Sequence, residues 1–359
     1  MRFRFALLAL SCGAALFAQT APRFDTAHMD RRVNPCTDFY QYACGTWMAK
    51  NPVPSDLAVW GRMAEVAEQN RAVLRGILEK AAAGGAARSA AERKIGDHYA
   101  ACMDESGVER RGIEPLKSEL DRIAAVKDRP GFAVAVARLH RIGAGALFRF
   151  SSAADMKDSA RMIAALDQGG LTLPDRDYYL KDDPQSAEIR AAYLEHLGRM
   201  FALLGEKPED AAAKARTVME LETGLARASL DRVTLRDPAR RYHKMTRHEL
   251  GSLAPEFAWD RYFEAAGAPK FETLNIAAPP FIRGLDELLN RNPLERWKVY
   301  LVWRLVNTAA DQLPAAFVKE NFEFFGRRLA GMRELRPRWK QCVAAVDGDL
   351  GEALGEQYV

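Results

Sequence analysis

The chain has 359 residues, of which 48% are hydrophobic and 28% are charged, an ordinary composition for a soluble globular protein. This length suffices for one large domain or two ordinary ones, with an ample core. The formal net charge is +4, and two of the arginines lie in a segment that we expect to be removed. The charge therefore gives no reason to expect nucleic acid or an anionic membrane as a partner.

Residues 1–18 have the pattern of an export signal. Arg2 and Arg4 provide a positive start, apolar residues follow, and a small residue precedes the expected cleavage point. A lipoprotein signal at Cys12 is one alternative, although the Ala-Leu-Ser before this cysteine fits it poorly. A retained anchor is another, but about 14 apolar residues are short of the ~20 that span a bilayer. We therefore expect an exported protein, periplasmic or extracellular, with an exposed leader at residues 19–34 and no membrane span after cleavage.

The next segment, residues 35–47, reads P-C-T-D-F-Y-Q-Y-A-C-G-T-W. An acidic first turn, a run of aromatic residues and a glycine that would end the helix at Gly45 together predict a short helix. In a helix, the Cα atoms of Cys36 and Cys44 would lie about 12 Å apart. A disulfide requires roughly 7 Å or less, so each sulfur would need a partner elsewhere.

Beyond this segment the apolar residues recur mostly at helical spacing. This periodicity predicts helices at residues 57–83, 89–103, 113–125, 130–142, 186–205 and 208–228. Residues 147–151 and 161–166 change to a pattern typical of two short strands, joined by a polar turn at 155–159. The sequence thus predicts a mainly α protein, one large multi-helix domain with a single small β-hairpin.

The best-marked helix is predicted to begin at Asn292. Asn292 is a suitable cap, Pro293 suits the first helical position, and Glu295 is placed to complete a capping box. From residue 294 to 313 the apolar side chains run almost all the way around the helix, which predicts a buried central helix. Charged residues such as Arg304 argue against a membrane span.

Several blocks of this sequence resemble, in the same order, the amino-terminal, non-catalytic region of the neprilysin-like zinc metallopeptidases. They cover most of the chain from about residue 30 to its end. The blocks are residues 35–47, Asn51-Pro52-Val53-Pro54, Leu173-Pro174-Asp175-Arg176-Asp177-Tyr178-Tyr179-Leu180, Lys244-Met245-Thr246, Trp303-Arg304-Leu305, Arg338-Trp339-Lys340-Gln341-Cys342 and Leu350-Gly351-Glu352-Ala353-Leu354. The resemblance implies that residues 35–359 form the helical amino-terminal domain of such a peptidase.

Four cysteines remain after removal of the signal, and an even number in an exported protein suggests disulfides. The resemblance implies a disulfide between Cys102 and Cys342, which would tie early helices to late ones. It pairs Cys36 and Cys44 with cysteines of the catalytic half of the family, and that half is not present in this chain.

One position departs from the family pattern in a way that bears on specificity. Relatives often carry an arginine, thought to hold the terminal carboxylate of a substrate, just before the aromatic-glycine pair that corresponds to Trp60-Gly61. This chain has Val59 there, and Arg62 lies three residues further on. Val59 and Arg62 are therefore the candidate substrate-facing residues, and the resemblance gives no support for a preference for dipeptide release.

The reaction of the resembled family needs zinc, held by two histidines one helical turn apart beside a glutamate base, with a further acidic ligand. Only His248-Glu249 begins such a motif, and Ser252 stands where the second histidine would be. The reversed motif fails as well, because Glu195-His196 has Ala192 at the partner position. We expect the six histidines, which are His28, His98, His140, His196, His243 and His248, to be surface or loop residues without metal. Zinc is expected only in the absent catalytic domain.

Other catalytic motifs are not found. The sequence has no Gly-x-Ser-x-Gly elbow, no Gly-x-x-x-x-Gly-Lys loop and no Cys-x-x-Cys pair. Asp175, Arg176 and Asp177 could form an acid-base cluster, but a loop-organising ion pair beside two packed tyrosines is the favoured interpretation. For Gly169-Gly170 a tight turn after a strand is favoured over a ligand loop.

The sequence supports three hypotheses. The favoured one is the substrate-gating half of an exported zinc metalloendopeptidase acting on peptides, itself inactive, whose catalytic domain lies in cis or on a separate chain. Because the chain stops at Val359, about where the family continues, we expect a truncated or split gene. The alternatives are a self-standing, non-enzymatic peptide-binding module and an inactive truncated fragment.

Overall fold

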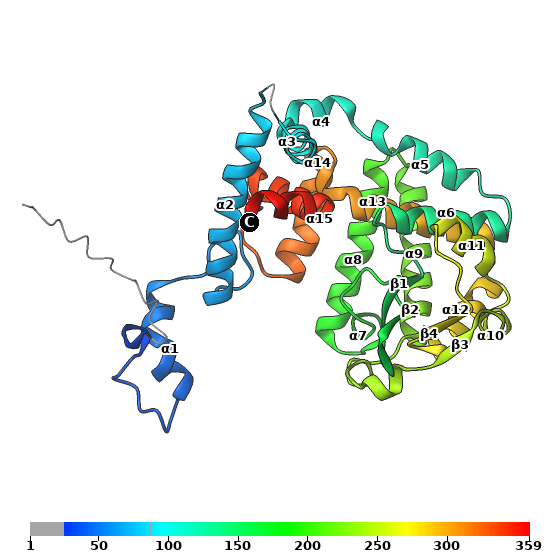
Figure 1. Cartoon of the computed structure of the whole chain (residues 1–359), viewed down its shortest axis with the longest axis horizontal. Helices are drawn as coiled ribbons and strands as arrows, with labels where there is room; N and C mark the ends of the chain where they lie inside the picture. The colour runs from blue at the N-terminus through cyan, green and yellow to red at the C-terminus, as the bar shows by residue number, and fades with distance from the viewer. Residues whose placement is uncertain (1–24, 86–87) are drawn as a thin grey trace, which may run out of the picture. The chain divides into compact units, whose positions relative to one another are not determined.

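A computed structural model describes residues 25–85 and 88–359 (Figure 1). The predicted export signal, Cys12 and the beginning of the predicted leader lie outside the described residues. The chain divides into two compact units, one ending at Pro54 and the other running from Ser55 to Val359. In the described part, no helix combines the length and the apolar character that crossing a membrane would require.

The first unit contains the 3-10 helix η1 (Thr26–His28) and the helix α1 (Phe39–Lys50). Asp38 caps α1, because its Oδ1 accepts a hydrogen bond of 2.8 Å from the backbone of Gln41. The prediction that Gly45 ends this helix is wrong, since α1 continues to Lys50. A Cβ at position 45 would lie 2.6 Å from Nε2 of Gln41 and 3.0 Å from Cβ of Asp30, so glycine permits close packing inside the unit.

The second unit is built mainly of α-helices, which confirms the predicted fold class. They are α2 (Arg62–Ala82), α3 (Ala90–Met103), α4 (Glu105–Arg111), α5 (Glu114–Ala124), α6 (Arg129–Arg141), α7 (Asp177–Leu180), α8 (Pro184–Leu203), α9 (Pro208–Ala228), α10 (Arg247–Leu253), α11 (Trp259–Ala266), α12 (Pro279–Arg291), α13 (Leu294–Ala309), α14 (Ala315–Asn321) and α15 (Arg338–Tyr358). Three short 3-10 helices and one π-helix complete the set, namely η2 (Thr234–Arg236), η3 (Pro238–Arg241), η4 (Ala310–Gln312) and the π-helix η5 (Phe322–Leu329).

The predicted helices occur with small changes at their ends. α3 begins with a complete capping box. The capping predicted for the central helix is wrong, because α13 begins at Leu294 with Pro293 as its cap residue and no side-chain capping bond. Nδ2 of Asn292 instead donates to the carbonyl of Leu288 at 2.9 Å, so Asn292 closes the preceding helix α12. Glu295 has no capping role here.

A four-stranded mixed sheet contains the predicted hairpin and extends it. β1 (Phe148–Asp155) and β2 (Asp158–Gln168) are antiparallel neighbours, with Phe148 opposite Gln168. β4 (Thr273–Ile276) pairs parallel to β2, and β3 (Lys244–Thr246) pairs antiparallel to β4, giving the order β1-β2-β4-β3. The hairpin prediction is confirmed, whereas β3 and β4 were not predicted because runs of three and four residues carry almost no periodicity.

The main core of the second unit is organised around α13, as predicted for a helix that is apolar on nearly all sides. Trp297, Tyr300 and Trp303 of α13 are buried and pack among α5, α6, α8 and α9. An aromatic group around Phe148 covers the start of the sheet, where the ring of Phe148 lies 5.0 Å from that of Tyr262. Both groups belong to one continuous hydrophobic cluster.

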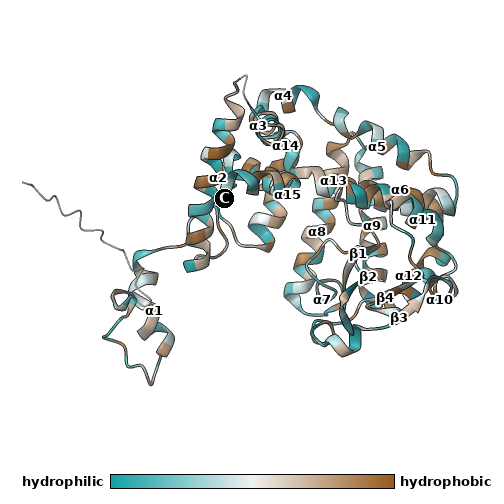
Figure 2. Cartoon of the chain, in the orientation of Figure 1, coloured by the Kyte–Doolittle hydropathy of each residue, from teal (hydrophilic) through white to brown (hydrophobic). Residues whose placement is uncertain are grey.

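A second, smaller core forms where α2, α3 and α15 pack together (Figure 1). Leu78 of α2, Ile95 of α3 and Val346 of α15 are buried at its centre. Along α2, apolar residues recur among polar ones at helical spacing (Figure 2), which is the pattern of a helix with one face in a core. Helices from the two ends of the second unit thus share one apolar core.

The turn of the hairpin generates a prediction about acid stability. Oδ1 of Asp155 accepts hydrogen bonds from the amide of Lys157 at 3.0 Å and from the hydroxyl of Tyr242 at 2.8 Å, and Nζ of Lys244 lies 3.1 Å from Oδ2. These contacts, the Lys157 amide foremost, lower the pKa of Asp155 from 3.8 to about 2. A depressed folded-state pKa stabilises the fold fully above the unfolded pKa, and this stabilisation is lost as the pH falls through about 2.

We therefore expect Asp155→Asn to be less stable than the wild type at neutral pH. The difference between their free energies of unfolding should shrink as the pH falls from 3.8 to about 2. Denaturant unfolding at a series of pH values measures the gap. Asp158→Asn, at an exposed position beside the same turn, is the matched control and should follow the wild type. A gap between Asp155→Asn and the wild type that does not change with pH would contradict the assignment.

Candidate functional site

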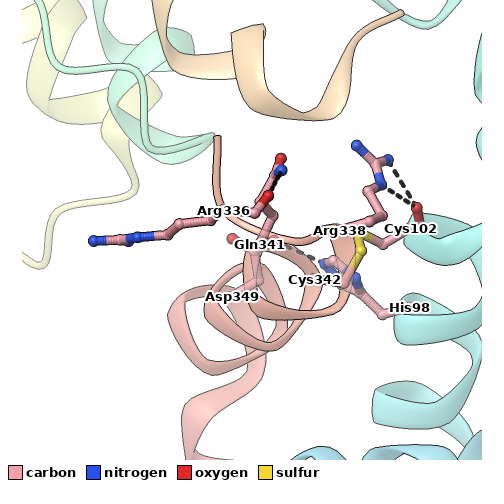
Figure 3. Close-up of a disulfide and its surroundings, with 7 residues drawn as sticks. All are labelled: His98, Cys102, Arg336, Arg338, Gln341, Cys342 and Asp349. Atoms are coloured by element: carbon pink, nitrogen blue, oxygen red, sulfur yellow. Dashed lines mark hydrogen bonds and ion pairs between the residues drawn. A yellow bond between two sulfur atoms is a disulfide. The ribbon is translucent and has the colours of Figure 1, made fainter. Parts of the chain in front are cut away.

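The structure joins two of the four cysteines. Cys102, at the end of α3, and Cys342, on α15, form a disulfide with a Cα–Cα distance of 5.6 Å (Figure 3). The guanidinium of Arg338 donates from Nε and Nη2 to the backbone carbonyl of Cys102 at 2.9 and 2.7 Å. Nε2 of His98 lies 2.8 Å from Oδ2 of Asp349, which adds a second polar link between the same two helices. The disulfide and these polar bonds therefore join α3 to α15, which also pack against each other through apolar residues.

The other two cysteines of the described chain are free thiols. Cys36 is exposed and precedes α1, while Cys44 is half-buried within that helix. The aromatic segment between the two cysteines is helical as predicted, but Cys36 lies outside α1, which begins after its cap at Asp38. Pairing of Cys36 and Cys44 with a catalytic half stays a prediction.

Val59 and Arg62 lie at the start of α2. Val59 is 74% exposed, and Arg62 is exposed with its Nη1 2.7 Å from Oε2 of Glu65. Because this ion pair already engages the Arg62 guanidinium, the structure gives no reason to treat it as a replacement for the arginine that relatives carry at the position of Val59. Met63 and Val66, on the next turns of α2, are exposed as well.

A buried polar network, which the sequence did not reveal, lies beside α13. Glu222 of α9 is fully buried. Its Oε1 accepts a hydrogen bond of 2.7 Å from Oγ1 of Thr172 and lies 3.7 Å from Nη1 of Arg304. Its Oε2 accepts hydrogen bonds of 2.7 Å from Tyr179 and 2.9 Å from Tyr193. Both carboxylate oxygens therefore have partners, as a buried charge requires.

Arg304 connects this network to the segment that precedes β1. Its Nε donates to the carbonyl of Gly145 at 2.5 Å and its Nη1 donates to Oγ1 of Thr172 at 2.8 Å. Burial raises the pKa of Glu222, while the charge of Arg304 and the hydroxyl donors favour its ionised form. The sequence offered two signals for this network. Glu222 stands in the apolar stripe of α9 between Leu221 and Leu225, and Arg304 interrupts the apolar run of residues 299–306 in α13.

The Asp175-Arg176-Asp177 segment organises its loop through partners that lie outside the segment. Asp175 pairs with Arg232, and its Oδ1 accepts a hydrogen bond of 2.7 Å from the backbone of Asp177. Arg176 donates from Nη1 to the carbonyl of Ser229 at 2.6 Å. The prediction missed these partners because they lie in the segment after α9, more than fifty residues further along the chain.

The tight turn predicted at Gly169-Gly170 follows the end of β2. Gly170 has a φ of +79°, and a Cβ there would lie 2.6 Å from the hydroxyl of Tyr300. That hydroxyl donates to the carbonyl of Gly170 at 2.8 Å. Glycine at position 170 therefore allows the loop to approach α13 closely.

The prediction that all six histidines are surface or loop residues is wrong for two of them. His196 is fully buried on α8, where its Nδ1 lies 2.9 Å from Oε1 of Glu320 and its ring stacks on Phe324 at 4.9 Å. His140, on α6, bonds through Nδ1 to the hydroxyl of Tyr262 at 2.7 Å. Burial lowers the pKa of both rings. Each of these histidines serves the packing of the core.

The described residues of this chain do not fit a zinc site. Among residues 25–85 and 88–359, no group of three or more His, Cys, Asp and Glu side chains is placed to hold a metal ion. His248 is exposed, and Ser252 uses its hydroxyl to donate to the carbonyl of His248 at 3.1 Å.

The buried ion pair yields a second prediction. We expect Glu222→Gln to lower the free energy of unfolding by about 3–5 kcal/mol, because it leaves the charge of Arg304 buried without a counter-charge. Arg304→Met should cost a similar amount, and the double variant should cost clearly less than the sum of the two. Denaturant unfolding measures all three.

A matched control for this cycle is the exposed pair of Glu287 and Arg291, which is 3.2 Å apart within α12. Its disruption by Arg291→Gln should cost less than about 1 kcal/mol. Strictly additive effects of Glu222→Gln and Arg304→Met would show that the two charges do not stabilise one another.

The disulfide yields a third prediction. Replacing Cys102 and Cys342 by serine should lower the free energy of unfolding of the second unit by about 2–5 kcal/mol, because the bond closes a long loop. The paired control, Cys36→Ser with Cys44→Ser, removes two free thiols and should leave this transition unchanged. Alkylation of the unreduced protein should label Cys36 and Cys44 but neither Cys102 nor Cys342, and labelling of Cys102 in the folded state would refute the assignment.

Comparison with known proteins places this architecture among peptidases. A family model for the amino-terminal part of peptidase family M13 matches residues 35–359. Endothelin-converting enzyme 1 of Mus musculus is 31% identical over 343 residues, which cover 92% of this chain and 44% of that protein. This chain therefore spans less than half the length of that relative.

Solved structures agree with the sequence comparison. Zinc metalloprotease Zmp1 of Mycobacterium tuberculosis, solved with an inhibitor, is 35% identical and superimposes with a TM-score of 0.89 over 94% of this chain and 51% of its own. PepO of Lactobacillus rhamnosis HN001, at 20% identity, shares the fold with a TM-score of 0.77 over 91% of this chain and 51% of its own. The family match, the sequence identity and the shared fold together show that this chain belongs to peptidase family M13, in its amino-terminal region.

Proposed function

We propose that this chain forms the substrate-gating half of an exported zinc metallopeptidase that acts on peptides, and that the zinc site lies on a catalytic domain in cis or on a separate chain. One observation carries the proposal: the match covers the amino-terminal part of the family from residue 35 to residue 359, and the matched relatives are about twice as long. The printed sequence contains no His-Glu-x-x-His motif, which is consistent with this division of roles.

In this proposal the chain selects peptide substrates, while the zinc ligands and the general base belong to the catalytic domain. An exposed apolar stripe on α2 supports this role. Met63, Val66 and Val73 lie on one helical face, and Val59 precedes them at the start of the helix. An apolar face of this kind suits contact with peptide side chains or with the second half of the enzyme.

Export is part of the same proposal. It rests on the signal-like pattern of residues 1–18 and on the disulfide between Cys102 and Cys342, because disulfides persist in oxidising compartments. A periplasmic or extracellular location would also allow Cys36 and Cys44 to bond to cysteines of the catalytic half.

The fourth prediction tests the proposed division. The purified chain, incubated with zinc and a mixture of short peptides, should show no cleavage that a chelator abolishes. Addition of a catalytic half, encoded in frame downstream or by a separate gene, should produce chelator-sensitive cleavage. Mass spectrometry of the peptides measures both.

Zmp1 of Mycobacterium tuberculosis, assayed on the same peptides, is the positive control for the conditions. Chelator-sensitive cleavage by the pure chain alone would overturn the proposal. Peptide binding by the chain, with no catalytic half that restores cleavage, would favour a self-standing binding module instead.

A further inference from the structure

A basic pocket opens beside the loop that follows the hairpin. It has a volume of about 330 Å³ and is lined by the ends of β1 and β2, by the Gly169-Gly170 turn and by the segment after α9. Four arginines line it, namely Arg149, Arg176, Arg232 and Arg304. Among the described residues, ion pairs account for Arg304 and Arg232, but not for the charges of Arg149 and Arg176.

Arg304 supplies the inner wall of this basic pocket. The residue is only 9% exposed, and its two hydrogen bonds to the protein use Nε and Nη1. Nη2 is used by neither bond, so its hydrogens are available to a ligand. The network around Glu222 holds the guanidinium in place from behind, so a ligand would meet a preorganised donor.

The outer wall has spare donors as well. Arg149 makes a single long hydrogen bond, from Nε to the carbonyl of Gln168 at 3.3 Å. Arg176 donates only from Nη1, to the carbonyl of Ser229. Within residues 25–85 and 88–359, neither Arg149 nor Arg176 has a carboxylate at ion-pair distance.

The charges around the pocket do not balance. Asp175 neutralises Arg232, and Glu222 neutralises Arg304 from behind the wall. The charges of Arg149 and Arg176 remain without a carboxylate partner in the described chain. Two uncompensated positive charges on the wall of a concave site attract anions and raise their local concentration.

We propose that this basic pocket binds a small ligand through an oxyanionic group, a carboxylate or a phosphate. Guanidinium groups present paired N–H donors that match the oxygen spacing of both anions. A volume of about 330 Å³ lies at the lower end of the range for small-molecule sites, so the ligand is a small acid or phosphate ester. The proposal does not depend on the peptidase function, because the pocket and its charges belong to this chain alone.

Thermal unfolding of the full chain with inorganic phosphate or with succinate, at constant ionic strength, tests the proposal. We expect at least one of the two anions to raise the Tm in a saturable way, and the anion that does so identifies the chemistry preferred. Arg149→Gln should weaken the apparent affinity at least about tenfold, because it removes charge-assisted hydrogen bonds. Arg176→Gln is a second variant with the same expected effect.

Arg161→Gln is the matched control, since it removes one positive charge from an exposed position on β2 that does not line the pocket. It should bind as the wild type does. Anions such as phosphate also stabilise proteins by exclusion from their surface, and that effect neither saturates nor depends on one arginine. The proposal would be overturned if the anions raised the Tm of the wild type and of Arg149→Gln equally, or if neither anion raised the Tm of the wild type.

Discussion

The buried pair of Glu222 and Arg304 is the interaction on which the arrangement of the second unit depends. Removing two charges from water costs several kcal/mol per ion, and further hydrogen bonds to both oxygens of Glu222 and to Nε and Nη1 of Arg304 offset this cost. Those partners come from four different segments: the residues before β1, the loop after β2, α7 and α8. A shift of α13 along its axis would break several of these bonds at once, so the network specifies one position for the central helix.

The same requirement explains how the loop between β2 and α8, which contains the short helix α7, is held against the core. Tyr179 uses its hydroxyl both to donate to Glu222 and to accept from the backbone amides of Thr172 and Leu173. Gly170 lets this loop approach Tyr300 closely. The loop is therefore rigid where it faces α13, and this rigidity gives the neighbouring basic pocket a fixed shape. Fold and pocket share one set of polar contacts, with Arg304 belonging to both.

Local signals in the sequence were sufficient for the long helices, the hairpin and the buried character of α13, because apolar periodicity acts over one or two turns. They were insufficient for β3 and β4, whose three and four residues become strands only by pairing with one another and with β2. Asn292 shows a different failure, since its side chain suits the start of one helix but serves the end of the previous one. The partnership of Glu222 with Arg304, 82 residues apart, requires knowledge of which helices meet.

The residues that stabilise this chain differ from those that are exposed for contact with another molecule. Glu222, a charged residue inside the core, has partners within the chain for both carboxylate oxygens, so it has no capacity left for a ligand. Val59, Met63 and Val66 show the opposite condition, because these apolar side chains remain in water at an energetic cost that contact with another apolar surface would relieve. Under the proposed substrate-gating role, the exposed face of α2 is the surface on which specificity would depend. The cross-linked core of α2, α3 and α15 gives that face a firm support.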